Sequence, residues 1–185
     1  MEDSTVRSTV FIAAFTALII VGAIFSFPAP WNPLVPLTLA TLFVILAGMM
    51  LGARRGLASV GLYLLLGLVG LPVFAGGSGG VQVLAGPTGG FLIGYALAAF
   101  LSGCIVRVSR TLPFLIVAAL AGTLAIYLPG LPWLHWRLVG KVNDWSWAST
   151  WGRYTAPFLI GDGIKAIAAV LICRGLQDRI NTQGR

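Results

Sequence analysis

Charged side chains are scarce in this sequence of 185 residues: Asp, Glu, Lys and Arg make up 9% of it, whereas hydrophobic residues make up 58%. An ordinary soluble domain carries roughly a quarter charged residues, so this surface cannot face water all round. A disordered chain is excluded too, because it would need high net charge and few large apolar groups. The composition therefore predicts an integral membrane protein in a lipid bilayer, with length for about six spans of roughly 20 residues.

Lys and Arg outnumber Asp and Glu by 12 to 5. Binding to nucleic acid needs a dense basic patch, and twelve basic residues are spread too thinly along this chain to form one. We therefore expect no nucleic-acid partner.

Residues for catalysis and metal binding are also few. His135 is the only histidine, four of the five acidic residues lie in polar ends or loops, and Cys104 and Cys173 lie in apolar stretches without metal-ligand spacing. No Walker phosphate loop and no dinucleotide fingerprint is present, so the chain itself does not hydrolyse ATP that way. We expect no catalytic residue, no metal and no cofactor.

Hydropathy predicts an all-α membrane protein of six transmembrane helices in a single domain, residues 1–185. The six apolar segments lie near 9–27, 36–53, 57–70, 88–106, 113–129 and 156–174. A signal peptide begins with a positively charged region, whereas this chain has the acidic residues Glu2 and Asp3 there. The first segment is therefore expected to be a retained helix.

The basic residues predict an orientation in which both termini are cytoplasmic. The inner side then holds Arg7, Arg54, Arg55, Arg107, Arg110, Arg174, Arg179 and Arg185. The outer side, with loops 28–35, 71–87 and 130–155, holds Arg137, Lys141 and Arg153. This distribution follows the positive-inside rule, and the reverse orientation violates it.

All six tryptophans lie in the expected outer loops or at their edges. An aromatic belt at the membrane interface accounts for them without a ligand. Alternatively, part of segment 131–155 folds over a pocket as an amphipathic cap.

Small residues recur at the four-residue spacing that lets helices approach closely in lipid. Gly48, Gly52 and Gly56 have this spacing, as do Ala13 and Ala17 in the first helix. Internal packing explains the pattern, and a groove for a partner protein explains it where the small face points out of the bundle.

Asp162 and Lys165 are the strongest local signal, because they lie within the sixth apolar segment. Residues three apart share a helical face, and the pair is expected about 10–15 Å from the outer end of its helix. Ionisable groups in a membrane usually face a cavity and serve function. A structural ion pair is the alternative, but Gly161 and Gly163 leave space beside the pair.

The stretch after the third helix is a second signal: residues 71–90 contain seven glycines yet remain apolar. Irregular backbone at membrane depth is tolerated only where it is buried in protein or lines a cavity. We therefore expect a glycine-rich outer loop whose backbone, including Gly79 and Gly80, meets a ligand. The loop lies on the same side as Asp162 and Lys165.

Three blocks of this sequence resemble the BioY family, the substrate-binding S-components of energy-coupling-factor (ECF) biotin transporters. The blocks are Gly70-Leu-Pro-Val-Phe-Ala-Gly-Gly-Ser-Gly-Gly80, Gly86-Pro-Thr-Gly-Gly90-Phe-Leu-Ile-Gly94-Tyr95 and Gly161-Asp162-x-x-Lys165. The resemblance implies a vitamin site near the outer face, a bacterial cell membrane, and biotin as ligand. It also implies a transmembrane coupling subunit, which packs on Ala13 and Ala17, and two cytoplasmic ATPases that alone use ATP.

With biotin as ligand, Asp162 is expected to accept hydrogen bonds from the ureido N–H groups and Lys165 to donate to the ureido carbonyl. Gln82 and Tyr95 are expected near the ring edge or the carboxylate tail, which alternatively lies towards Lys141 or Arg153. Three other functions stay open: an S-component for another vitamin, a stand-alone facilitator, and an intramembrane enzyme using Lys165 and Asp162.

Overall fold

The computed structural model describes residues 2–29, 32–139, 141 and 146–183. Its elements in chain order are α1 (Glu2–Ile24), β1 (Ser26–Ala29), β2 (Asn32–Thr38), α2 (Ala40–Leu51), α3 (Ala53–Leu68), the 3₁₀ turn η1 (Ala75–Gly77), α4 (Val81–Ala85), α5 (Gly89–Val108), α6 (Leu112–Leu138), α7 (Trp147–Tyr154) and α8 (Ala156–Gln183). The prediction of a mostly helical, apolar chain is confirmed, and each of the six apolar segments contains a helix.

The helices differ in length. Among the described residues, four helical segments are long and apolar enough to cross a membrane: Thr5–Ile24, Gly89–Val108, Leu112–Leu138 and Trp147–Leu176. The helices α2 and α3 have 12 and 16 residues and are separated at Gly52, whose φ of 81° ends one helix and starts the next. An L residue with a side chain rarely adopts this φ, so a glycine is required at the turn.

The chain departs from the predicted pattern before α2, where residues 26–38 form an antiparallel hairpin. Ser26 pairs with Thr38 and Phe27 with Leu37, so α2 begins at Ala40 rather than near 36. Pro33 and Pro36 lie within β2, and proline is poorly tolerated in a helix interior, which explains the late helix start. The hairpin is held to α1 by the backbone N–H of Leu39, which donates to the carbonyl of Gly22 at 2.8 Å.

The prediction of an outer loop over 130–155 is wrong for its first part, because α6 continues to Leu138 through Pro129 and Pro132. This part of α6 packs against α5 and the segment before it: the Phe91 ring lies against Gly130, and Trp133 Nε1 donates to the carbonyl of Gly86 at 2.8 Å. Packing against neighbouring helices is one reason why proline is tolerated within membrane helices.

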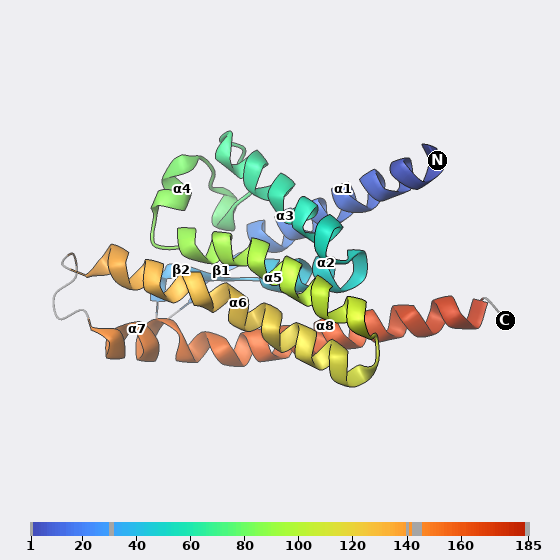
Figure 1. The fold of residues 1–185 in the computed structure, drawn as a ribbon. Coiled ribbons are helices and arrows are strands. Elements are labelled where there is room, and N and C mark those ends of the chain that lie inside the picture. Colours follow the sequence, from blue (N-terminus) through green and yellow to red (C-terminus); the bar gives the residue numbers. More distant parts are fainter. Residues whose placement is uncertain (1, 30–31, 140, 142–145, 184–185) are drawn as a thin grey trace.

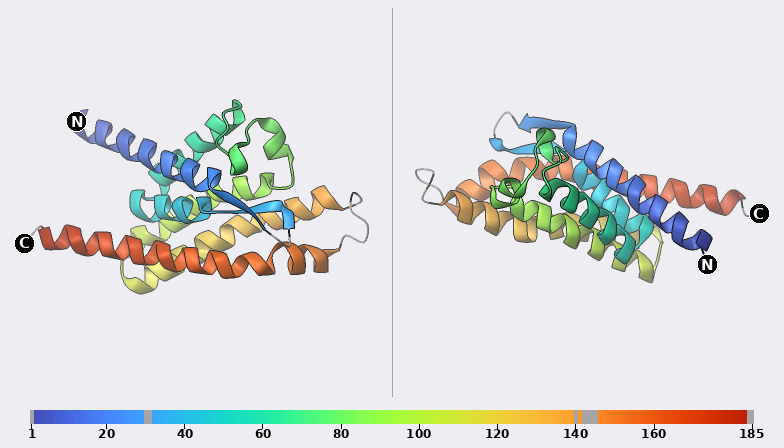
Figure 2. Two further views of the ribbon diagram at one scale, coloured as in Figure 1. Left: turned by 180° about the vertical axis from the view of Figure 1, so that it is seen from behind. Right: turned by 90° about the horizontal axis from the view of Figure 1, so that it is seen from above.

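The two ends of the bundle differ. Both chain termini lie at one end, together with the α2–α3 turn and the connection from α5 to α6 (Figure 1). The hairpin and α4 lie at the other end, as the two further views confirm (Figure 2). We call these the terminal end and the hairpin end.

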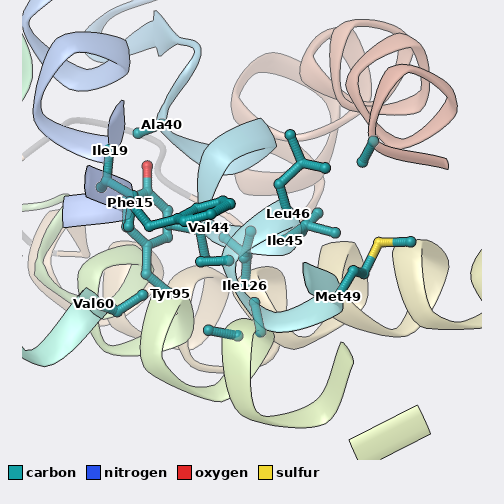
Figure 3. Packing of buried hydrophobic residues seen from close by; sticks show 14 of the residues in the cluster. Phe15, Ile19, Ala40, Val44, Ile45, Leu46, Met49, Val60, Tyr95 and Ile126 are labelled. Carbon is teal, nitrogen blue, oxygen red and sulfur yellow. The ribbon is translucent and has the colours of Figure 1, made fainter. Parts of the chain in front are cut away.

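The helix α2 is the centre of the core. Seven of its residues are buried: Ala40, Val44, Ile45, Leu46, Ala47, Gly48 and Met49. Figure 3 shows Val44 between Ile19 of α1 and Ile126 of α6, with Ile45 beside Leu46. A short helix that is buried in this way requires its neighbouring helices to pack very closely against it.

Glycines permit that approach. A Cβ at Gly48 would lie 2.2 Å from Ser102 Oγ and 2.3 Å from the carbonyl oxygen of Ala99, and a Cβ at Gly56 would lie 2.8 Å from the Cα of Gly48. The predicted packing role of Gly48 and Gly56 therefore holds, whereas Gly52 serves as the break between two helices.

We expect Gly48→Ala to destabilise the protein by about 1–3 kcal/mol, because the added methyl overlaps backbone and hydroxyl oxygen atoms. Gly61→Ala is the matched control, since nothing lies within 4 Å of a Cβ at Gly61 in the middle of α3. Thermal unfolding in detergent measures both, and an equal midpoint for the two variants would contradict the packing described here.

Candidate functional site

A cavity of about 260 Å³ lies at the hairpin end of the bundle. Its wall is built by residues from β2, α1, α2, α3, α4, α5, α6, α8 and the loop after α3. They are Ala23, Val35, Pro36, Leu37, Thr38, Thr41, Tyr63, Phe74, Ala75, Ser78, Val83, Thr88, Phe91, Leu92, Tyr95, Ile126, Tyr127, Phe158, Asp162 and Lys165. The lining is mainly apolar, with a few polar groups, as is usual for small-molecule sites.

Asp162 and Lys165 both lie in the cavity wall. Asp162 is six residues into α8, about 9 Å from the start of that helix. Lys165 Nζ donates to Asp162 Oδ1 at 2.9 Å, and the two side chains are only 11% (Asp162) and 14% (Lys165) exposed. The i, i+3 spacing therefore places both side chains on one face, as predicted, where they form an ion pair and line the cavity.

Two hydroxyl groups from other helices complete the surroundings of this carboxylate. Tyr127 of α6 donates its hydroxyl proton to Asp162 Oδ2, and Thr41 of α2 donates to Oδ1 at 3.4 Å. Sequence analysis missed both residues, since each lies within an apolar segment and meets Asp162 only in three dimensions. The carboxylate thus accepts three hydrogen bonds from three helices.

Aromatic rings form the apolar part of the wall. Tyr63 stacks on Tyr95 with ring centroids 6.5 Å apart and meets Phe74 edge to face at 5.4 Å. Phe91 meets Tyr127 edge to face at 6.0 Å. Tyr95 was predicted here, whereas Tyr63, Phe74 and Phe91 were not singled out.

The glycine-rich loop shapes the wall through its turns. A Cβ at Gly67 would lie 2.0 Å from the ring of Phe74, so only glycine admits this ring over the end of α3. Gly80 donates its N–H to the carbonyl of Gly67 at 2.7 Å, and a Cβ at Gly79 would lie 2.2 Å from the carbonyl oxygen of Leu71. Gly79 and Gly80 hold the loop in place and are not part of the lining.

Gln82 is also outside the lining. Its side chain is exposed, and its Nε2 donates to the carbonyl of Gly79 at 2.7 Å. The polar side-chain amide that made Gln82 a candidate therefore forms its hydrogen bond within the loop itself.

Lys165 is the only cationic residue in the described lining. Lys141 is exposed and does not line the cavity, and the side chain of Arg153 lies outside the described residues. The remaining polar side-chain groups of the wall, apart from Asp162, are hydroxyls: Thr38, Thr41, Tyr63, Ser78, Thr88, Tyr95 and Tyr127. Among the described residues, no three His, Cys, Asp or Glu side chains are grouped as a metal site would require.

A statistical model of the family described as "BioY family" matches residues 1–182. This chain belongs to the BioY family. Two relatives illustrate the similarity: "Probable biotin transporter BioY" of Pyrococcus horikoshii is 43% identical, over 90% of this chain and 93% of the relative. "Biotin transporter BioY" of Thermotoga maritima is 41% identical, over 88% of this chain and 91% of the relative.

A solved structure is similar as well. It is described as the crystal structure of the S-component for biotin from an ECF-type ABC transporter, and it matches with a TM-score of 0.84 at 31% identity. The match covers 96% of this chain and 94% of the other. The family and its structural neighbour are transporter components and not enzymes.

The described tryptophans of this BioY chain do not line the cavity. Trp136, Trp147 and Trp151 are exposed, and no described residue of α7 lines the cavity. The short helix α7 is attached to α6 by His135, which stacks on Trp147 at 3.9 Å and hydrogen-bonds Thr150. This arrangement favours the interfacial belt over the cap; Trp31 and Trp145 lie outside the described residues.

The hydrogen bonds predict unequal effects of breaking the ion pair. Lys165→Met leaves the carboxylate with its two hydroxyl donors, whereas Asp162→Leu leaves a half-buried ammonium without its carboxylate. We expect Asp162→Leu to destabilise the protein more, by roughly 1–3 kcal/mol, and the double variant to lose less than the sum of the single losses. Thermal unfolding of the four proteins measures this, and strictly additive losses would show that the two charges do not interact.

Proposed function

We propose that this protein captures biotin from outside the cell and delivers it inward as the S-component of an ECF-type transporter. Membership of the BioY family and the similarity to a biotin S-component support this function. The observation that carries it in this chain is the Asp162–Lys165 pair in the wall of an otherwise apolar cavity.

The donors and acceptors of the pair match the ureido group of biotin, which has two N–H donors and one carbonyl acceptor. An ionised carboxylate offers about four acceptor positions, and Asp162 uses three of them, which leaves one for a ureido N–H. Lys165 donates one of its three protons to Asp162 and keeps two for the ureido carbonyl. A ligand without these polar groups would leave buried partners unpaired, so the site discriminates against it.

Tyr127 supplies an acceptor for the second ureido N–H. Its proton is committed to Asp162, so its oxygen presents a lone pair to the cavity side of the carboxylate. The fused rings of biotin then pack against Tyr63, Phe74 and Tyr95. The carboxylate tail is held by hydroxyl donors of the wall, since the described lining offers no second cation.

The orientation in the membrane follows from the charges. The terminal end carries the start of α1, the α2–α3 turn and the α5–α6 connection (Figure 1), and these segments contain Arg7, Arg54, Arg55, Arg107 and Arg110, whereas the end of α6, with Arg137, lies at the hairpin end. The positive-inside rule then places both termini in the cytoplasm and the cavity and glycine-rich loop outside. In this proposal α1, α2, α3, α5, α6 and α8 form the six spans.

A transmembrane coupling subunit docks on α1, and two cytoplasmic ATPases supply the energy. Ala13 and Ala17 are exposed and share a face of α1 with Val6 and Val10. Small residues of this kind let a second helix approach closely in lipid.

Biotin titration of the purified protein tests the site. We expect Asp162→Asn and Lys165→Met to weaken binding roughly 10- to 100-fold, because each removes a charge-assisted hydrogen bond, and Tyr127→Phe to weaken it about 10-fold. Gln82→Ala is the matched control and is expected to stay within about twofold of wild type.

Undiminished binding in all three variants would overturn the assigned roles. Tighter binding of thiamine or riboflavin than of biotin would favour an S-component for another vitamin.

Uptake of labelled biotin tests the docking face. We expect Ala13→Trp and Ala17→Trp to reduce uptake about 10-fold or more in cells that supply the coupling subunit and ATPases, because the indole blocks close helix approach. Biotin binding by the purified variants stays unchanged. Leu18→Trp is the control, since Leu18 is exposed on α1 but lies about 100° or more around the helix from Ala13 and Ala17.

If the wild-type protein takes up biotin equally well in cells with and without the ATPases, it would instead be a stand-alone facilitator. If the three tryptophan substitutions reduce biotin uptake equally, Ala13 and Ala17 are not the docking face.

A further inference from the structure

A second hollow lies at the terminal end of the bundle, far from the cavity. It is a groove of about 460 Å³ between the α2–α3 turn and the end of α5. Gly52 and Ala53 line one side, and Arg107, Ser109 and Arg110 line the other. Nothing in the proposed capture of biotin uses this groove.

The groove is basic. Arg107 and Arg110 are exposed, and neither forms an ion pair within the described part of the chain, whose one salt bridge is Asp162–Lys165. Arg107 and Arg110 are also the only charged residues of the described lining. No acidic residue is in the described lining, and the side chains of Glu2, Asp3 and Asp178 on α1 and α8 lie outside the described residues.

The groove is formed by tight backbone packing. A Cβ at Gly103 would lie 2.3 Å from the backbone nitrogen of Ala53, so α5 rests directly on the α2–α3 turn. After α5 the chain is extended at Ser109, whose Oγ accepts the N–H of Thr111 at 3.3 Å. The backbone that carries the two arginines is therefore fixed against the turn.

Exposed apolar residues lie near the two arginines along the chain. Val108 is 76% exposed, and Leu101, Leu112 and Phe114 are exposed as well. They belong to α5 and α6, which are long and apolar enough to span a membrane. A pair of cations bordered by exposed apolar residues fits an amphiphile with an anionic head, and fits a free anion or an acidic peptide less well.

We propose that this groove binds the headgroup of an anionic phospholipid of the inner leaflet. The phosphate lies between the guanidinium groups of Arg107 and Arg110, since arginine donates paired hydrogen bonds to phosphate. The acyl chains lie along Leu101 and Leu112. Basic pockets between helices on the cytoplasmic side of membrane proteins bind anionic lipids in this way. The assignment of the leaflet rests on the proposed orientation.

Native mass spectrometry of the purified protein, with titrated lipids, tests the proposal. We expect phosphatidylglycerol to bind the wild type more tightly than phosphatidylcholine does. Arg107→Gln/Arg110→Gln is expected to weaken phosphatidylglycerol binding roughly 10- to 30-fold. Arg54→Gln/Arg55→Gln is the matched control, with the same loss of charge at the same end but outside the groove lining, and is expected to bind as wild type does.

Arg107→Lys/Arg110→Lys is a second variant that keeps the charge and loses the paired geometry, so its affinity is expected to be intermediate. An equal loss in the two glutamine variants would overturn the proposal, because it would indicate a general surface field. No preference for phosphatidylglycerol would overturn it as well. Competition by millimolar inorganic phosphate would show a free-anion site and no lipid site.

Biotin titration of the same variants separates this proposal from the proposed function. We expect Arg107→Gln/Arg110→Gln to bind biotin as the wild type does, which also shows that the variant is folded. If no protein binds biotin while the lipid preference follows Arg107 and Arg110, the function fails and the lipid site stands.

Discussion

The ion pair between Asp162 and Lys165 is the constraint on which the site depends. Either charge alone at membrane depth is unfavourable by several kilocalories per mole, so each requires partners from the surrounding helices. Lys165 comes from the same helix by its spacing, whereas the hydroxyls of Thr41 and Tyr127 come from α2 and α6. Three helices must therefore converge on one carboxylate, and the cavity lies where they converge.

Glycine makes this convergence possible. A Cβ at Gly94 of α5 would lie 2.6 Å from the carbonyl oxygen of Ile126 in α6. This close contact between the two helices fixes the backbone at Ile126, and therefore the position of the next residue, Tyr127. In the same way Gly48 brings α2 against α5, and Gly67 admits Phe74 to the cavity wall. The glycines thus position the polar network and the aromatic rings without lining the cavity themselves.

The sequence predicts what depends on neighbours along the chain. Hydropathy locates the six helical segments, and the three-residue spacing predicts the pairing of Asp162 with Lys165. It does not predict Tyr127 or Thr41, which lie 35 and 121 residues from Asp162 and meet it only through packing. Packing also lets α6 continue past Pro129, and a local hydrogen bond holds the side chain of Gln82 within its loop, outside the cavity lining.

Competition between biotin analogues tests most directly whether Asp162 and Lys165 bind the ureido group. Iminobiotin replaces the ureido carbonyl by a cationic guanidinium-type group, and biotin methyl ester blocks the carboxylate. The account predicts that iminobiotin binds roughly 10- to 100-fold more weakly than biotin, because Lys165 then faces a cation in place of an acceptor, while the ester loses less. The reverse order, with iminobiotin binding as biotin does and the ester failing to bind, would place the carboxylate at Lys165 and contradict the account.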